Sequence, residues 1–433
     1  MPLGIAGSTV RRAQVGSIPA GLGVATRRLL SGCNVNSGQP KSRPIPQAGQ
    51  QFRPPFALMT CPLIRPVSLL YEGLVRLMKR GPVRIARWGR CTLALVVATM
   101  LWSSAGASQT QHYPGASWEL IPSAQSGWSD QRLDQAWAYA REIGSTAVVV
   151  VQHGSIVASW GETDTDLLLN SARKSLLSAL IGIAVQADEV HLDDTLARLG
   201  IDDNPPSLTA EEKQATVHDL LEARSGVYHP ANYETREMEI RRPQRGSHPP
   251  GTFWYYNNWD FNTLGAIYEH ATGSSVFTAF AQQIAGPIGM QDFDAAKCRY
   301  SGGPSSRYPA YLFYASARDL ARFGLLYLRK GRWSNQQIIP AAWVQESTQP
   351  YSITHGRTGY GYLWWTMALT GPSRVEAPPG TYWAEGNGGQ IIFVVPAYDV
   401  VVVHVAREDN RHKVSNSDAL RLIEEVLAAR PGS

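Results

Sequence analysis

Cysteine is scarce in this chain of 433 residues, which has four, and Cys298 alone lies beyond residue 107. The part of the chain after residue 107 therefore cannot form an internal disulfide. Two catalytic signatures are also missing: there is no Gly-x-Ser-x-Gly nucleophile elbow, and the ten histidines lack the His-Glu-x-x-His spacing of a zinc site. We therefore expect neither a metal nor another cofactor.

Acidic residues are nearly absent from the first part of the chain. Residues 1–107 contain 14 Lys and Arg but a single acid, Glu72. Although the whole chain has a formal net charge of +5, the residues after 107 hold 26 basic against 34 acidic side chains. The basic excess belongs to a leader, so it does not indicate an anionic partner, and we expect no nucleic-acid binding.

From Met78 onward the leader has the order of an export signal. A basic stretch precedes an apolar run at 91–102, and the small residues Ala105-Gly106-Ala107 follow it. Because the run is short of the roughly 20 residues that cross a bilayer, a cleaved signal peptide is favoured over a membrane anchor. We predict three segments: a non-native or disordered extension (1–77), a signal peptide (78–107) and a mature domain (108–433). The protein would then be periplasmic or secreted, with no stable membrane anchor.

Strand-like runs lie near both ends of the mature part, and helical periodicity lies between them. Residues 147–152 and 155–160 are typical of a hairpin, and apolar spacing after Ser171 predicts a long buried helix to Val185. Further helices are predicted at 220–223, 262–271, 317–328 and 417–429, and further strands at 361–366, 390–396 and 400–406.

This distribution predicts an α/β (α+β) fold in which N- and C-terminal strands build one antiparallel sheet flanked by helices. Residues 190–300 are richer in proline, charge and aromatic side chains than the flanking segments. We expect them to form a mostly helical lobe inserted into the sheet domain.

Ser171-Ala172-Arg173-Lys174 is the one Ser-x-x-Lys in the chain, and it stands at the start of the predicted buried helix. Residues at i and i+3 share a helix face, so Ser171 and Lys174 can contact each other. A serine hydroxyl needs an adjacent base, and a lysine can supply one once burial or a cationic neighbour has lowered its pKa. A helix cap with a surface lysine is the alternative, which the surrounding leucines disfavour.

A second candidate is the aromatic stretch after Pro250-Gly251. Tyr-x-Asn occurs there in two registers, Tyr255-x-Asn257 and Tyr256-x-Asn258. A phenol can relay a proton, and an amide can hold the lysine or a substrate carbonyl. The residues alone leave both registers open. Trp254, Tyr255 and Trp259 further suggest an aromatic-walled pocket.

Together with Ser171–Lys174, three further motifs carry a resemblance: 223–227 (ARSGV), the Pro-Gly turn with its Tyr-x-Asn, and 384–390 (AEGNGGQ). In this order they resemble the β-lactamase-related serine hydrolases. Within that group, the motif sequences are most similar to those of class C-like esterases and 6-aminohexanoate-oligomer hydrolases. The resemblance begins near Leu133 and reaches the C-terminus. It implies a site between a sheet domain and a helical lobe, and a transient acyl-enzyme.

Carried over to this chain, the resemblance makes Ser171 the nucleophile and Lys174 the general base. The family spacing after Pro-Gly selects Tyr256 as proton relay and Asn258 as a support. Gly386 would close the motif on the strand that faces the serine, and the backbone N–H of Asn387 would be the second oxyanion donor after that of Ser171.

One departure from the family pattern bears on the substrate. Relatives that process β-lactams or cell-wall peptides carry Lys or His two residues before the motif glycine. Here the position holds Ala384, or Trp383 in the other register, and Glu385 is adjacent. A later arginine, Arg407 or Arg411, could supply the charge instead.

We therefore expect a serine hydrolase that acts on a small-molecule ester or amide. Two alternatives stay open: a catalytically weak or silent penicillin-binding-like protein that binds cell-wall or peptide ligands, and a true β-lactamase or DD-peptidase.

Overall fold

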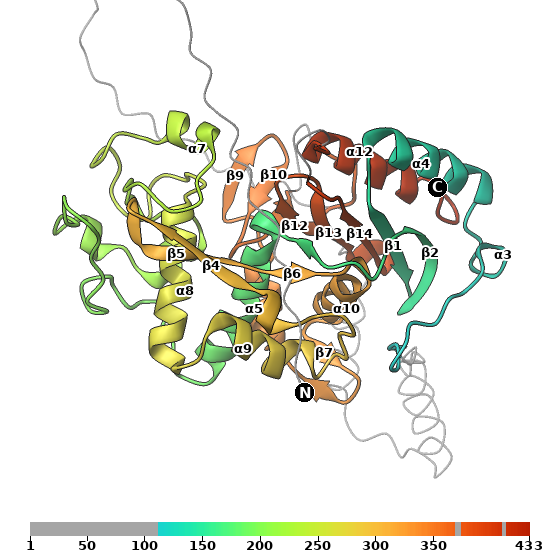
Figure 1. Cartoon of the computed structure of the whole chain (residues 1–433), viewed down its shortest axis with the longest axis horizontal. Coiled ribbons are helices and arrows are strands. Elements are labelled where there is room, and N and C mark those ends of the chain that lie inside the picture. Colours follow the sequence, from blue (N-terminus) through green and yellow to red (C-terminus); the bar gives the residue numbers. More distant parts are fainter. Residues whose placement is uncertain (1–110, 369–373, 409–412) are drawn as a thin grey trace, which may run out of the picture. The chain divides into compact units, whose positions relative to one another are not determined.

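Eight antiparallel strands form one sheet in the computed structural model, which describes residues 111–368, 374–408 and 413–433. They are β1 (Ala147–Gln152), β2 (Ser155–Gly161), β9 (Ser352–His355), β10 (Thr358–Tyr360), β11 (Trp365–Met367), β12 (Tyr382–Gly386), β13 (Gln390–Val395) and β14 (Val400–Val405). The strand order is β2-β1-β14-β13-β12-β11-β10-β9, so the N-terminal hairpin pairs directly with the C-terminal strands (Figure 1). The predicted fold class is confirmed.

Both faces of the sheet are covered by helices, which explains the unbroken valine runs of β1 and β14. Val148 and Val150 face α4 (Asp130–Ile143) and α12 (Asn416–Leu427), which pack against each other on one face (Figure 1). Val149 and Val151 face the opposite side, where α10 (Ala317–Leu328) crosses β1, β13 and β14. A strand buried on both faces needs apolar residues at every position.

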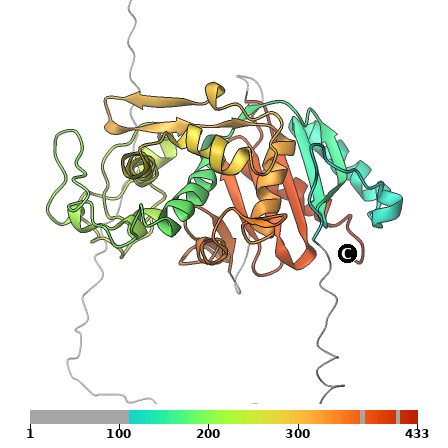
Figure 2. The same cartoon turned by 90° about the horizontal axis from the view of Figure 1, so that it is seen from below.

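Helix α5 (Arg173–Gln186) lies between the sheet and the lobe helices (Figures 1 and 2), and a short 3-10 turn, η1 (Asn170–Ala172), precedes it. Leu176, Leu177 and Leu180 on it have no exposed surface. The helix is apolar around most of its circumference because it packs against α8 and α9 on one side and β12 on the other.

Between residues 190 and 300 the structure has α6 (Val217–Leu221), α7 (Arg236–Arg241), α8 (Asn258–Thr272) and α9 (Val276–Phe280), joined by long loops. A hairpin of β4 (Arg299–Gly303) and β5 (Ser306–Leu312) follows and packs on α8. The predicted helix at 220–223 is wrong at its end, because Ala223 has a left-handed φ of 57°. The remaining elements are α3 (Ser123–Ser126), α11 (Ala341–Ser347), β3 (Leu167–Leu168), β6 (Tyr314–Ala315), β7 (Arg332–Trp333) and β8 (Gln336–Gln337).

The strand predicted at 361–366 is wrong over residues 361–364 and right only for Trp365 and Thr366, which belong to β11. The chain turns there between β10 and β11, with Leu363 at a left-handed φ of 63° and the Gly361 N–H donating to the Trp364 carbonyl at 2.8 Å. The segment has the apolar composition of a strand because Leu363 and Trp364 of this turn are buried in the core. Burial of a turn and burial of a strand produce the same composition.

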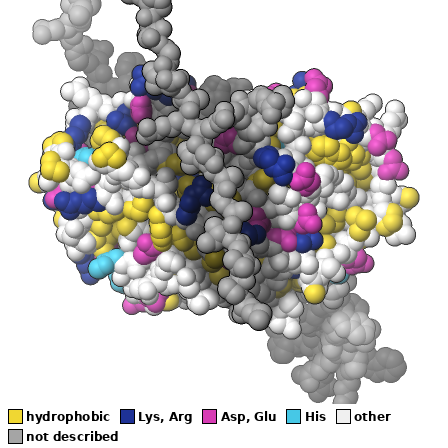
Figure 3. Space-filling view, viewed as in Figure 1, with side chains coloured by type: hydrophobic (Ala, Val, Ile, Leu, Met, Phe, Trp, Pro, Cys, Tyr) yellow, Lys and Arg dark blue, Asp and Glu magenta, His cyan; other side chains and the backbone are white. Residues whose placement is uncertain are grey.

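Within the described ranges no helix is both long and apolar enough to span a membrane. The extension and signal peptide predicted over 1–107 lie outside the described residues, all of which belong to one unit, Ser103–Ser433. On the uncovered part of the face in Figure 3, Lys and Arg side chains are interspersed with Asp and Glu.

Candidate active site

Ser171 lies in the turn that delivers the chain into α5. The residue before it, Asn170, has a left-handed φ of 48°, a conformation that asparagine tolerates better than most residues. The side chain of Asn170 is fixed on three sides. Its Nδ2 donates to the Asn387 carbonyl at 2.7 Å and to Glu408 at 3.2 Å, and its Oδ1 accepts from the Tyr233 hydroxyl at 2.8 Å. These bonds set the direction in which Ser171 leaves the turn.

Lys174 contacts Ser171 across the first turn of the helix. Its Nζ lies 2.7 Å from Ser171 Oγ and 2.9 Å from the Tyr256 hydroxyl, and its side chain is 1 % exposed. Burial, and then the positive charge of Arg173, hold the pKa of Lys174 well below its ordinary value. Lys174 Nζ also lies 4.7 Å from the ring centroid of Phe261. No described carboxylate forms an ion pair with it, so the neutral amine is favoured.

The two candidate tyrosines have different partners. The Tyr256 hydroxyl accepts a hydrogen bond from Lys174 Nζ, and burial raises the pKa of this phenol, so it stays protonated. Tyr255 instead donates to the Met238 carbonyl at 2.7 Å. The loop that holds both is pinned to the 223–227 segment, because the Tyr255 N–H donates to the Ala223 carbonyl and Gly251 N–H to that of Arg224.

The two asparagines of the motif, Asn257 and Asn258, also have different locations and partners. Asn257 caps α8, where its Oδ1 accepts from the Trp259 N–H at 3.0 Å. Asn258 lies at the cavity beside Ser171 and donates from Nδ2 to the Tyr233 carbonyl at 2.5 Å. Its buried Oδ1 has no hydrogen-bond partner among the described residues.

Gly386, the last residue of β12, lies against the serine turn. A Cβ at this position would come within 2.2 Å of the Leu169 carbonyl oxygen and 3.0 Å of the Ala172 nitrogen. Only glycine permits that approach of strand and turn. The next residue, Asn387, lines the same small cavity as Ser171, about 140 Å³ in volume.

Side chains alternate between the two faces of the sheet along β12, so Ala384 points to one face and its neighbours Trp383 and Glu385 point to the other. Ala384 faces the side that contains α5, whereas Trp383 is buried on the opposite face with α4 and α12. Glu385 also turns to that opposite face, where its carboxylate binds Arg374, the Trp383 indole and Asn416 of α12. Its charge is thereby paired away from the cavity. Of the two arginines considered, Arg407 pairs with Glu162, and Arg411 lies outside the described residues.

The sequence did not predict six of the residues that line the cavity: Asn170, Tyr233, Glu234, Thr235, Met238 and Glu408. Asn170 adjoins Ser171 in sequence, but the other five come from distant segments and carry no motif. The aromatic wall expected from Trp254, Tyr255 and Trp259 is wrong, because none of the three lines this cavity. Trp259 is fully buried and donates to Asp203 at 2.7 Å, and Tyr255 is buried against Tyr228, so neither borders the cavity.

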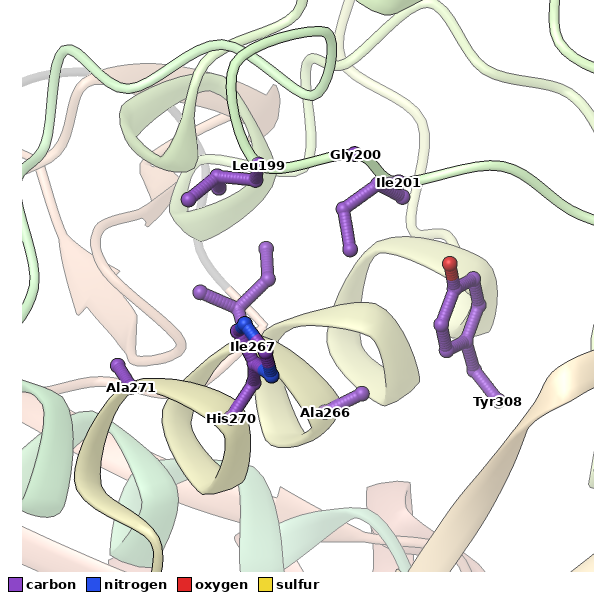
Figure 4. A pocket seen from close by; sticks show the side chains of 8 residues that line it. All are labelled: Leu199, Gly200, Ile201, Ala266, Ile267, His270, Ala271 and Tyr308. Carbon is purple, nitrogen blue, oxygen red and sulfur yellow. The ribbon is translucent and has the colours of Figure 1, made fainter.

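A second hollow lies on the outer side of α8, away from Ser171. Figure 4 shows Leu199 and Ile201 on a loop opposite Ile267 and His270 of the helix, with Tyr308 at one end. Its lining is mostly apolar and includes no serine and no lysine, so the Ser-Lys chemistry of the candidate site does not extend to it.

The chain is 25 % identical over 196 residues to Esterase EstB of Burkholderia gladioli, which covers 38 % of this chain and half of that protein. A solved structure described as a candidate 6-aminohexanoate-dimer hydrolase from Bacillus anthracis superposes with a TM-score of 0.51 at 20 % identity, covering 73 % of this chain and 85 % of that one. A penicillin binding protein from Bacillus halodurans gives 0.51 at 18 % identity over 67 % and 99 %.

At these identities the two solved structures establish a shared fold. The Beta-lactamase family model matches residues 130–427, which include the sheet, the lobe and the cavity at Ser171. Because that segment is more than half of the chain, this protein belongs to the beta-lactamase family.

Proposed function

We propose that this protein is a serine hydrolase that cleaves an ester or amide through an acyl-enzyme. The observation that carries the proposal is the contact of Lys174 Nζ with both Ser171 Oγ and the Tyr256 hydroxyl, at 2.7 and 2.9 Å. Lys174 is buried and has no ion pair with a carboxylate in the described part of the chain. A lysine kept neutral beside a serine is a general base.

In this proposal Lys174 takes the proton of Ser171 as Oγ bonds to the substrate carbonyl carbon. The N–H groups of Ser171 and Asn387 receive the oxyanion, with Gly386 allowing the close approach and Asn258 supporting the substrate. When the carbon–oxygen or carbon–nitrogen bond breaks, Tyr256 relays a proton to the leaving group. Water then attacks the acyl-enzyme, gives up its proton to the same base, and releases the acid and Ser171.

For the substrate we propose a neutral small-molecule ester or amide. Ala384 offers no charge to a substrate carboxylate, and an unpaired charge in a partly desolvated cleft is costly. A silent binding protein is the rival from another class, and a β-lactamase or DD-peptidase is the rival within the hydrolases. The site machinery favours an enzyme because Ser171, Lys174 and Tyr256 are all in contact range.

Labelling with a fluorophosphonate tests the nucleophile. The protein should be labelled on Ser171, and Ser171→Ala should lose both the label and turnover of p-nitrophenyl esters by orders of magnitude. Ser175→Ala is the matched control, because that hydroxyl donates to the Leu363 carbonyl at 2.7 Å and is not next to the amine. An unlabelled protein, or a label that persists in Ser171→Ala, would overturn the proposal.

For the location we propose export from Met78, with cleavage after Ala107 and no stable anchor. Mass spectrometry of the protein recovered from periplasm or medium should find Ser108 as its first residue. A first residue upstream of Met78 contradicts this.

A further inference from the structure

Arg173 is a buried cation that forms no ion pair with a carboxylate of the described residues. Its side chain has no exposed surface, and its Nη1 donates a hydrogen bond to the Asn170 carbonyl at 2.7 Å. Nε and Nη2 are buried and have no hydrogen-bond partner among the described residues. A guanidinium stays protonated throughout the pH range in which enzymes work. Such an unpaired interior charge destabilises the fold. Its presence therefore points to a role other than stability.

Two aromatic rings partly compensate the charge without neutralising it. The guanidinium carbon lies 5.4 Å from the ring centroid of Tyr233 and 5.2 Å from that of Tyr311. Ring faces stabilise a cation by about 1–2 kcal/mol each and leave its field intact. Arg173 therefore projects a positive potential into its surroundings, and the residue that follows it is Lys174.

Other charged groups packed around the site do not cancel this field. On β12, Glu385 is held by Arg374 on the opposite face of the sheet. On α8, burial raises the pKa of Asp260 well above its ordinary value, which disfavours the charged form, and its Oδ1 accepts from Ser225 and Asn257.

Two more carboxylates line the cavity, and both are paired. Glu234 forms an ion pair with Arg242, and Glu408, which follows β14, is paired with Lys413 and accepts from Asn170. Arg299 on β4 lies over the Tyr314 ring. Of the described side chains, Arg173 is the one charge that acts directly on Lys174.

We propose that Arg173 is a positioning residue that keeps Lys174 in its neutral, base-competent form by charge repulsion from within the helix. The inference rests on the proposed function. Arg173 lies behind the serine turn, so its charge acts on Lys174 and not on a substrate carboxylate. Like charges brought together in a low-dielectric site disfavour the second protonation.

The test is the pH dependence of fluorophosphonate labelling and of kcat/KM for a p-nitrophenyl ester. In Arg173→Gln and Arg173→Met, Lys174 should become easier to protonate. The acid limb should then move to higher pH by about one unit or more, with about a tenfold loss below the limb and recovery on the alkaline plateau. Arg299→Gln is the matched control, because it removes an exposed arginine from a ring without touching Lys174, and its limb should stay in place.

A limb that does not move in folded Arg173 variants, or a loss that is equal at every pH, would overturn the inference and leave the Ser171 assignment standing. If the wild type itself is not labelled on Ser171, the proposed function fails instead.

Should the Arg173 variants fail to fold, Tyr233→Glu and Tyr233→Gln carry the test, since this half-buried ring adjoins the guanidinium. The carboxylate variant should have its acid limb at higher pH than the amide variant. Coincident limbs would contradict the inference.

Discussion

Tyr255 and Tyr256 are adjacent and chemically identical, yet their hydroxyl groups have different hydrogen-bond partners. The Tyr256 hydroxyl contacts the Lys174 amine, whereas Tyr255 donates to the Met238 carbonyl of α7 and so ties that helix to the loop before α8. A proton can pass only through the first contact. The choice between the two registers of Tyr-x-Asn is thus made by a hydrogen bond, since both registers satisfy the motif.

Tyr256→Phe should lower kcat/KM for a p-nitrophenyl ester about a hundredfold or more, because a proton relay contributes on that scale. Tyr255→Phe should leave kcat/KM within a few-fold and lower the free energy of unfolding by about 1 kcal/mol, the usual cost of one hydrogen bond. Steady-state kinetics and thermal unfolding of the pair measure both effects. The reverse order of activities would transfer the relay to Tyr255.

At the scale of elements, the turn from β12 to β13 is pressed against the turn that carries Ser171. Gly386 makes the contact possible, and His404 on β14 supports the far side of the turn, where its Nδ1 bonds the Gly389 carbonyl and its Nε2 lies 2.8 Å from Ser145 Oγ. Two backbone segments that are far apart in sequence are thereby held in register.

Gly386→Ala should slow fluorophosphonate labelling at least tenfold, because its Cβ would meet the Leu169 carbonyl at 2.2 Å and push strand and turn apart. The free energy of unfolding should fall by about 1–3 kcal/mol, as expected for an overpacked site. Gly115→Ala is the control, since nothing lies within 4 Å of its added Cβ. Unchanged labelling in Gly386→Ala would mean that the strand does not bear on the serine.

His404 should make stability depend on acid. Burial lowers its pKa from 6.5 to about 4, so between these values the unfolded chain binds a proton that the folded chain does not. The contribution is present above pH 6.5 and is lost as the pH falls toward 4, by about 3 kcal/mol in all. His404→Gln should lack this part of the slope. Urea unfolding of both proteins from pH 7 to 4 measures it, and parallel curves would contradict the assignment.

At the scale of the whole molecule, the site joins a sheet domain to the lobe, and its walls decide what can enter. Ala384 faces the α5 side without a charge, and Glu408 borders the cavity. The neutral esters p-nitrophenyl acetate and butyrate should therefore have higher kcat/KM than nitrocefin, whose carboxylate would lack a partner.

Ala384→Lys should raise acylation by nitrocefin relative to ester hydrolysis, and Ala384→Met, similar in size but uncharged, should not. A strong preference of the natural protein for nitrocefin would reveal a cation that pairs with the carboxylate.

Several parts of this molecule follow from its sequence alone. The valine runs of β1 and β14, apolar at every position, predict strands buried on both faces, and the spacing of Ser171 and Lys174 places them on one side of a helix. These are local properties, because the period of the backbone decides which side chains share a face. Local sequence also produced the wrong prediction at 361–364, because a buried turn there has the composition of a strand.

Tertiary structure decided what depends on residues far apart in the chain. Asn170, Tyr233 and Glu408 meet at the cavity only because three separate segments converge there, and no spacing in the sequence encodes that convergence. Arg173 gave no sign of being an interior charge, because arginine is ordinarily a surface residue. Its burial between two rings arises from packing of the lobe onto α5, and packing sets the dielectric that makes one charge act on its neighbour.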